Sequence, residues 1–132
     1  MKDSMLRDLL DWDTLKKLEP CAGGHDDYMK SLFKGATVLA HWNEGDYQGE
    51  VATAVQLADG RYCWYQDSYG SCSGCDSWED AAWDDVQELC KGLASDAEVF
   101  ATKEEMLADM LRPRAESWKS DAGSNLHKLL AA

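Results

Sequence analysis

The spacing of apolar residues changes between residues 36 and 66, and this change constrains the fold more than any other feature of the sequence. Apolar and polar residues largely alternate there, which is the period of a β-strand with one buried face. Asp59-Gly60 is a strong signal for a tight hairpin turn, and a second turn is expected at Asn43-Glu44-Gly45-Asp46. The segment therefore predicts a three-stranded antiparallel β-meander, with a β-bulge at Gly49.

Residues 1–35 have the helical spacing of apolar residues instead. They predict a helix that begins near Ser4 and ends before Glu19-Pro20, because the residue before a proline avoids the helical conformation. A second, short helix is expected over residues 26–34, ended by Gly35. The first part of the chain is therefore expected to be helical.

Two further helices are indicated by capping signals, in each case with a glutamate three residues after the capping residue. Asp76 is the first signal and lies in residues 67–94, after a loop with two cysteines. Thr102 is the second and opens residues 102–132, where a final short helix is also expected. A chain of 132 residues has room for one domain. We therefore predict a single α+β domain in which the β-meander packs against several α-helices that cover one face of its sheet.

The charge of the chain narrows the classes of partner. There are 13 basic and 25 acidic residues, and residues 36–99, with two basic and 13 acidic side chains, hold −11 of the net charge of −12. Direct binding to nucleic acid needs lysine and arginine on phosphates, and anionic membranes attract basic segments, so neither is expected. The charge favours a partner protein with a basic patch.

One helical face of the central segment would be acidic. Asp76, Asp80, Asp84 and Glu88 follow one another at four-residue spacing, which places them on one side of a helix. Such a stripe is either a solvated face or a surface for a basic partner, and mimicry of a nucleic-acid backbone is a third possibility. We treat all four residues as candidates for partner binding.

Aromatic residues are the second candidate for an interface. Tyr62 and Trp64 lie on one face of the third predicted strand, and Tyr69 follows that strand. If one face of the sheet packs on helices, the other face can expose these rings, which are enriched at binding hot spots. They can equally complete a small core, and the sequence does not decide which face is exposed.

Cys72 and Cys75 form the third candidate, in a glycine-containing turn ahead of a helix. A Cys-x-x-Cys turn can supply two ligands to a structural zinc ion, and Cys21 with His25 would complete the set. Cys63, Cys90 and His41 are further possible donors. The same two thiols could instead act in a thiol-dependent enzyme, form a disulfide or be idle.

The sequence gives little support for catalysis or export. No arrangement of a nucleophile, a base and an acid stands out, so a non-enzymatic protein is expected. The first residues lack the apolar run of a signal peptide, and no apolar stretch is long enough to span a membrane. The odd count of five cysteines also fits a reducing compartment, so we expect a cytoplasmic protein.

The stretch Tyr-Gly-Ser-Cys-Ser-Gly-Cys-Asp at residues 69–76, followed by Ser77-Trp78-Glu79, resembles a motif of small uncharacterised proteins of bacteriophages and actinobacteria. The resemblance covers roughly residues 37–92, and it implies a phage accessory protein that acts in the host cytoplasm. The leading hypothesis is a non-enzymatic acidic protein that binds and modulates a host protein. A zinc-stabilised binding module, a thiol-dependent enzyme and a nucleic-acid mimic are the alternatives, and the oligomeric state is left open.

Overall fold

The computed structural model describes residues 4–18, 25–44, 49–69, 83–112 and 122–131. Helices and strands are mixed, and the strands form one open antiparallel sheet in the order β1-β2-β3-β4. The strands are β1 (Thr37–Asn43), β2 (Gly49–Gln56), β3 (Tyr62–Tyr69) and β4 (Glu98–Phe100). The helices are the 3-10 helix η1 (Ser4–Leu9) and the α-helices α1 (Trp12–Lys17), α2 (His25–Lys30), α3 (Trp83–Asp96), α4 (Lys103–Met110) and α5 (Ala122–Ala131).

The predicted three-stranded meander is confirmed by β1, β2 and β3, but the sheet has a fourth strand, β4, that was not predicted. β4 follows α3 and pairs only with the first three residues of β3, with Cys63 opposite Val99. The predicted bulge is also wrongly placed. Gly49 pairs with Tyr69 in regular register, whereas the ladder shifts between Val38 and Ala40 in β1.

The hairpin between β2 and β3 has the glycine that its turn requires. Gly60 has a φ of 94°, in the left-handed region that favours glycine. Its amide donates to the carbonyl of Leu57 at 2.9 Å, and the amide of Leu57 donates to the carbonyl of Arg61 at 2.7 Å. Asp59 also accepts a hydrogen bond from the Arg61 amide at 3.0 Å. The Asp59-Gly60 signal therefore fixes the pairing of the two strands.

The predicted first helix is broken into two short pieces. η1 ends at Leu9, and Leu10 forms an isolated bridge with Phe33. Asp11 then caps α1 by accepting a hydrogen bond from the amide of Thr14 at 3.3 Å. The break follows because an aspartate in the cap position starts a new helix while the backbone before it pairs with another segment.

The predicted start of α4 is confirmed. Thr102 has extended backbone angles, and its hydroxyl accepts a hydrogen bond from the amide of Glu105 at 3.2 Å. The other capping signal, Asp76, lies outside the described residues, and α3 is described from Trp83 onward.

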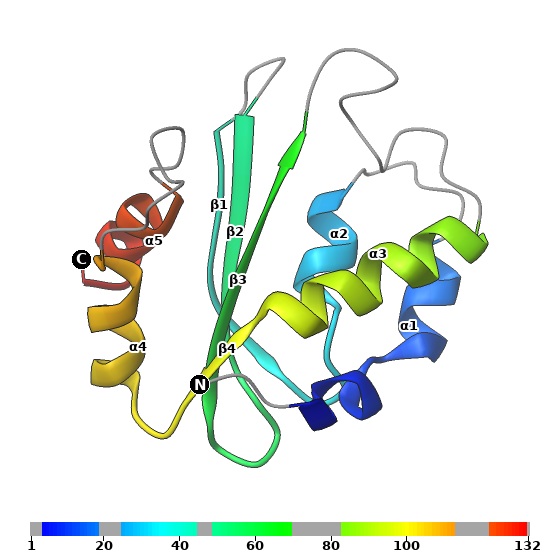
Figure 1. Ribbon diagram of the computed structural model, residues 1–132, viewed down its shortest axis with the longest axis horizontal. Coiled ribbons are helices and arrows are strands. Elements are labelled where there is room, and N and C mark those ends of the chain that lie inside the picture. Colours follow the sequence, from blue (N-terminus) through cyan, green and yellow to red (C-terminus); the bar gives the residue numbers. More distant parts are fainter. Residues whose placement is uncertain (1–3, 19–24, 45–48, 70–82, 113–121, 132) are drawn as a thin grey trace.

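Helices cover both faces of the sheet, which corrects the expectation that they would cover one (Figure 1). One face packs on η1 and α1–α3, in a core that includes Val51, Val55 and Tyr65. The opposite face packs on α4 and α5 around Trp64, with Ala52 and Ala54 beside it. Both faces of the sheet are apolar here. On the second face, the alternating positions hold alanine and tryptophan rather than polar residues.

Gly123 lies where α5 meets α4 and the sheet. A Cβ atom at this position would lie 2.5 Å from the carbonyl oxygen of Met110 and 3.1 Å from the ring of Trp64. The first of these atoms belongs to the backbone and cannot turn away. Only a residue without a side chain therefore permits this approach of the two helices.

Replacing Gly123 by alanine is expected to destabilise the fold by roughly 1–3 kcal/mol, because the two helices must move apart. The measurement is the free energy of unfolding in urea. Gly92→Ala is the matched control in α3, because a Cβ atom there meets nothing within 4 Å. It should stabilise the protein by about 0.5–1 kcal/mol. Equal effects of the two substitutions would contradict the close approach at Gly123.

Candidate functional site

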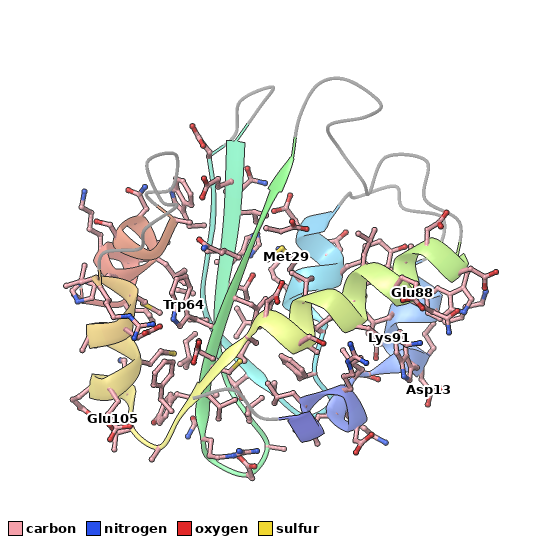
Figure 2. All side chains as sticks on the ribbon, viewed as in Figure 1. Asp13, Met29, Trp64, Glu88, Lys91 and Glu105 are labelled. Atoms are coloured by element: carbon pink, nitrogen blue, oxygen red, sulfur yellow. The ribbon has the colours of Figure 1, made fainter. Side chains whose placement is uncertain are left out.

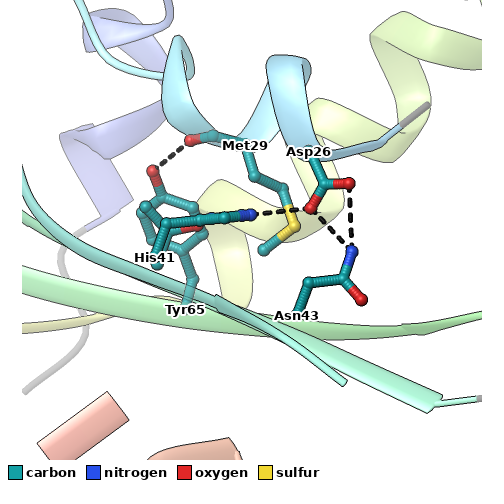
Figure 3. Close-up of polar contacts among 6 residues, drawn as sticks. Asp26, Met29, His41, Asn43 and Tyr65 are labelled. Carbon is teal, nitrogen blue, oxygen red and sulfur yellow. Dashed lines mark hydrogen bonds and ion pairs between the residues drawn. The ribbon is translucent and has the colours of Figure 1, made fainter. Parts of the chain in front are cut away.

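A polar cluster joins α2 to the sheet (Figure 3). Asp26 lies in the first turn of α2, and its Oδ1 is 2.7 Å from Nε2 of His41 on β1. The side-chain amide of Asn43, two residues further along β1, donates to both oxygens of Asp26 at 2.8 and 3.0 Å. Nδ1 of His41 is 2.8 Å from the hydroxyl of Thr53 on β2. The cluster therefore ties one helix to two adjacent strands.

The order Thr53–His41–Asp26 is that of a nucleophile, a base and an acid, but the geometry does not suit that chemistry. The Thr53 side chain is fully buried, so its hydroxyl cannot reach a substrate. His41 contacts Thr53 through one ring nitrogen and Asp26 through the other, as the base of a triad would, but no substrate atom can reach the buried hydroxyl. With a neutral ring, Nε2–H donates to Asp26 and Nδ1 accepts from Thr53. The cluster is therefore a structural tether.

Sequence reasoning did not find this cluster because its members are separated by up to 27 positions. The available signal was weak. His41 and Asn43 lie two residues apart on one strand, which places both on the same face. That face packs against α2, so both polar side chains lie at a helix–sheet contact.

The described thiols are buried and unreactive. Cys63 on β3 and Cys90 on α3 are free and fully buried. Burial raises the pKa of each thiol to about 12, so almost none of the nucleophilic thiolate is present at neutral pH. Tyr65 beside them donates to the carbonyl of Met29 at 2.5 Å, and burial likewise raises the pKa of its hydroxyl. These groups belong to the core.

Trp64 is placed in the second core rather than on an exposed face (Figure 2). Its side chain is 4% exposed, and Nε1–H donates to Oδ2 of Asp109 at 2.9 Å. The other oxygen of Asp109 lies 3.1 Å from the guanidinium of Arg112. Of the two alternatives that the sequence leaves open, the structure therefore favours the core for Trp64, because α4 and α5 cover its face. Tyr62, its neighbour on that face, is half-buried.

A shallow hollow of about 580 Å³ lies beside β4 and α4. Its lining is mixed, with apolar, acidic and basic side chains from one strand and one helix. The lining residues are Phe100, Glu105, Ala108, Asp109, Leu111 and Arg112. Of its charged groups, Asp109 and Arg112 pair with each other, and Glu105 is exposed in the first turn of α4.

The acidic face of α3 is present in the part of the helix that the structure describes. Asp84, Asp85 and Glu88 are exposed, and the last has a side chain that is 77% accessible. Figure 2 shows Glu88 and Lys91 on the outer side of α3, and their charges are 3.5 Å apart. The opposite side of α3 is buried through Val86, Cys90, Leu93 and Ala94. The helix therefore separates an apolar side from an acidic, solvent-facing side.

The N-terminal end of α3 is held against α1 by aromatic contacts. The rings of Trp83 and Trp12 meet edge to face with centroids 6.0 Å apart. The ammonium group of Lys16 lies 4.8 Å from the centre of the Trp83 ring. These contacts fix the direction in which Asp84 and Glu88 face, because they anchor the residue that begins the helix.

Several predicted site residues have no described surroundings. Cys21, Cys72, Cys75, Asp76 and Asp80 lie outside the described residues. Tyr69 ends β3 and His25 begins α2, and only their backbone positions are described. Within the described ranges, no three His, Cys, Asp or Glu side chains are placed to hold a metal ion. The zinc and thiol hypotheses for Cys72 and Cys75 therefore remain predictions.

Comparison of the chain with protein-family models, with curated proteins and with solved structures gave no match. No helix among the described residues has the length and apolar character needed to cross a membrane. The resemblance to phage and actinobacterial proteins remains a prediction.

Proposed function

We propose that this chain is a non-enzymatic binding protein that recognises a basic surface on a partner protein through the acidic side of α3. The observation that carries the proposal is the exposure of Asp84, Asp85 and Glu88 on a helix whose other side is anchored in the core. A rigid helix keeps these charges in fixed positions. A partner with lysine or arginine residues at matching spacing would then meet them without reordering the binding surface.

The electrostatics of the whole chain support the same proposal. The net charge is −12, and the described part of α3 has one basic residue, Lys91, among its charged side chains. Charge of one sign over a surface speeds the approach of an oppositely charged partner and repels anionic ones. It would disfavour nucleic acid and anionic membranes as direct ligands. A basic protein is the partner class that this field would attract.

The described side chains offer little for catalysis, which further supports a binding role. The hydroxyl of Thr53 is buried in the polar cluster, and the thiols of Cys63 and Cys90 are buried in the core. In the hollow beside α4, two of the three charged side chains, Asp109 and Arg112, pair with each other. In line with the resemblance of residues 69–79, we further propose that the chain is a phage accessory protein and that its partner is a protein of the host cytoplasm.

The test is capture of partners from an actinobacterial lysate with the tagged chain and with the variant Asp84→Asn/Glu88→Gln. The variant keeps the size of both side chains and removes two negative charges. We expect its affinity for the captured protein to fall roughly threefold to thirtyfold, since an exposed ion pair contributes about 0.2–1 kcal/mol and each lost charge can serve more than one pair. Titration of the purified partner measures the change.

Glu104→Gln/Glu105→Gln is the matched control. These glutamates are exposed in the first turn of α4, on the opposite layer of the molecule, as Figure 2 shows for Glu105. The control removes the same charge from the whole chain, so it should change the affinity much less. Equal losses of affinity in the two variants would show that the partner responds to the net charge of the chain and not to the acidic side of α3. Undiminished binding of the Asp84 and Glu88 variant would overturn the proposed surface.

A further inference from the structure

We propose that the ring of Trp83 binds an arginine side chain of the partner protein, and that Lys16 occupies this ring until that arginine displaces it. The inference rests on the proposed function and names the side-chain chemistry that the partner must present. Trp83 begins α3 and directly precedes Asp84 and Asp85, which are exposed. The ring therefore belongs to a residue at the border of the acidic side of α3.

The ring of Trp83 already binds a cation of the chain itself. The ammonium group of Lys16 lies 4.8 Å from the ring centre, which is within the distance at which the face of an aromatic ring attracts a positive charge. The side chain of Lys16 is exposed, and that of Trp83 is half-buried. The contact therefore marks a cation site at the surface of the molecule, where a cation from a partner can compete with Lys16.

The position of the ring does not depend on Lys16 alone. Trp12 meets the ring of Trp83 edge to face, with centroids 6.0 Å apart and an angle of 84° between the ring planes. Both tryptophans also pack against the core on this face of the sheet. Lys16 can therefore leave the ring while Trp83 keeps its place, and the face of the ring is then available to another cation.

Exposed carboxylates accompany this cation site on both helices. Asp13 precedes Lys16 by three positions on α1, which places their side chains on the same side of that helix. On α3, Asp84 and Asp85 follow Trp83. All three acids are exposed. A cation that carries several hydrogen-bond donors would therefore have acceptors close to the ring.

Arginine fits this combination of a ring and carboxylates better than lysine does. The planar guanidinium group can stack on an aromatic ring while its N–H groups donate to carboxylates, whereas an ammonium group is compact and strongly hydrated. An exposed cation–π contact is weak, and it changes a binding constant by roughly twofold to fivefold. Lys16 is therefore readily displaced, and an arginine of the partner is the stronger ligand for the ring.

The test uses two alanine-based helical peptides that carry either arginine or lysine at positions one helical turn apart and are otherwise identical. Fluorescence anisotropy of the labelled peptides measures their binding to the full chain at low salt. We expect the arginine peptide to bind roughly threefold to tenfold more tightly. Equal affinities would overturn this inference but not the proposed function. If neither peptide bound, both the inference and the proposed function would be contradicted.

Lys16→Ala is expected to bind the arginine peptide roughly twofold to fivefold more tightly than Lys17→Ala does, because only the first variant removes the competing cation. The two lysines are exposed neighbours in the last turn of α1, so each substitution removes the same charge from the same end of the helix. Far-ultraviolet circular dichroism checks that both variants are folded. Equal affinities of the two variants would show that Lys16 does not compete for the ring.

Trp83→Leu is a second variant, which keeps an apolar side chain in a half-buried position and removes the aromatic face. It should bind the arginine and lysine peptides with equal affinity, because the preference for arginine depends on the ring. The lysine peptide serves as the internal control, since a loss of folding would weaken both complexes alike. A preference for arginine that persisted in this variant would overturn the role of Trp83.

Discussion

Replacing Trp64 by alanine is expected to lower the free energy of unfolding by about 3–5 kcal/mol, because the change removes the largest side chain of the core beneath α4 and α5. The loss has two sources. The ring is buried against Met106, Met110 and Leu126, so its removal leaves a cavity. The indole N–H donates to Asp109, so its removal also takes a hydrogen bond from a nearly buried carboxylate.

The two sources can be measured separately. Trp64→Phe keeps much of the ring and removes the donor, and it should cost roughly 1–3 kcal/mol. In the variant Asp109→Ala the indole N–H has already lost its acceptor. Adding Trp64→Phe to that variant should therefore lower the free energy of unfolding by less than it does in the native chain. The comparison is made by urea unfolding of the native chain, of Trp64→Phe, of Asp109→Ala and of the variant with both substitutions. A loss below about 1 kcal/mol for Trp64→Ala would mean that the ring lies on an exposed face.

Alkaline pH is expected to destabilise the fold through its two buried thiols. Burial raises the pKa of Cys63 and of Cys90 from 9.0 to about 12 in the folded state. Between these values the unfolded chain has released the thiol protons while the folded chain still holds them. The unfolded state therefore binds fewer protons, and the free energy of unfolding falls as pH rises. The loss reaches up to about 4 kcal/mol for each thiol at pH 12.

The measurement is the free energy of unfolding at several values between pH 8 and pH 11, with a reducing agent present. Cys63→Ala/Cys90→Ala is the matched variant. It should be less stable than the native chain at pH 8, because the core loses two sulfur atoms, but its stability should fall less steeply with pH. Tyr65 supplies the remaining slope above pH 10, since burial raises the pKa of its hydroxyl as well. If the free energy of unfolding fell equally steeply with pH in the native chain and in the variant, the two thiols would not be the cause of the alkaline destabilisation.

The strands that sequence predicts well are those with local signals. Alternation and the Asp59-Gly60 turn place β2 and β3, because a period of two and a left-handed glycine are properties of the segment itself. The same holds for Thr102, whose cap depends on a residue three positions away. β4 has no such signal. Three residues between two helices become a strand only because β3 is beside them.

The coverage of both sheet faces depends on packing that alternation does not encode. Ala52 and Ala54 are apolar, but their small size can equally serve an exposed strand. They are buried because α4 and α5 pack over this face, around Trp64. The sequence therefore leaves the exposure of Trp64 undecided, because its hydrogen-bond partner Asp109 lies 45 positions away in the chain. Only the folded chain brings the two together.

The candidate site could be predicted only where it depends on local spacing. Four-residue spacing identifies Asp84 and Glu88 as one side of a helix, and both are exposed on α3. The cluster of Asp26, His41 and Thr53 depends on contacts between one helix and two strands. No local spacing predicts such a contact, so the cluster had no sequence signal of comparable strength.

Binding of a basic partner through the acidic side of α3 is tested most directly by the rate at which the chain associates with its captured partner. Stopped-flow or surface-based kinetics at low and physiological salt would measure this rate constant for the native chain and for Asp84→Asn/Glu88→Gln. We expect the native rate constant to fall roughly tenfold or more as salt rises, and the variant to start lower and depend less on salt. A native rate constant that is the same at both salts and in the variant would contradict recognition of a basic surface by α3.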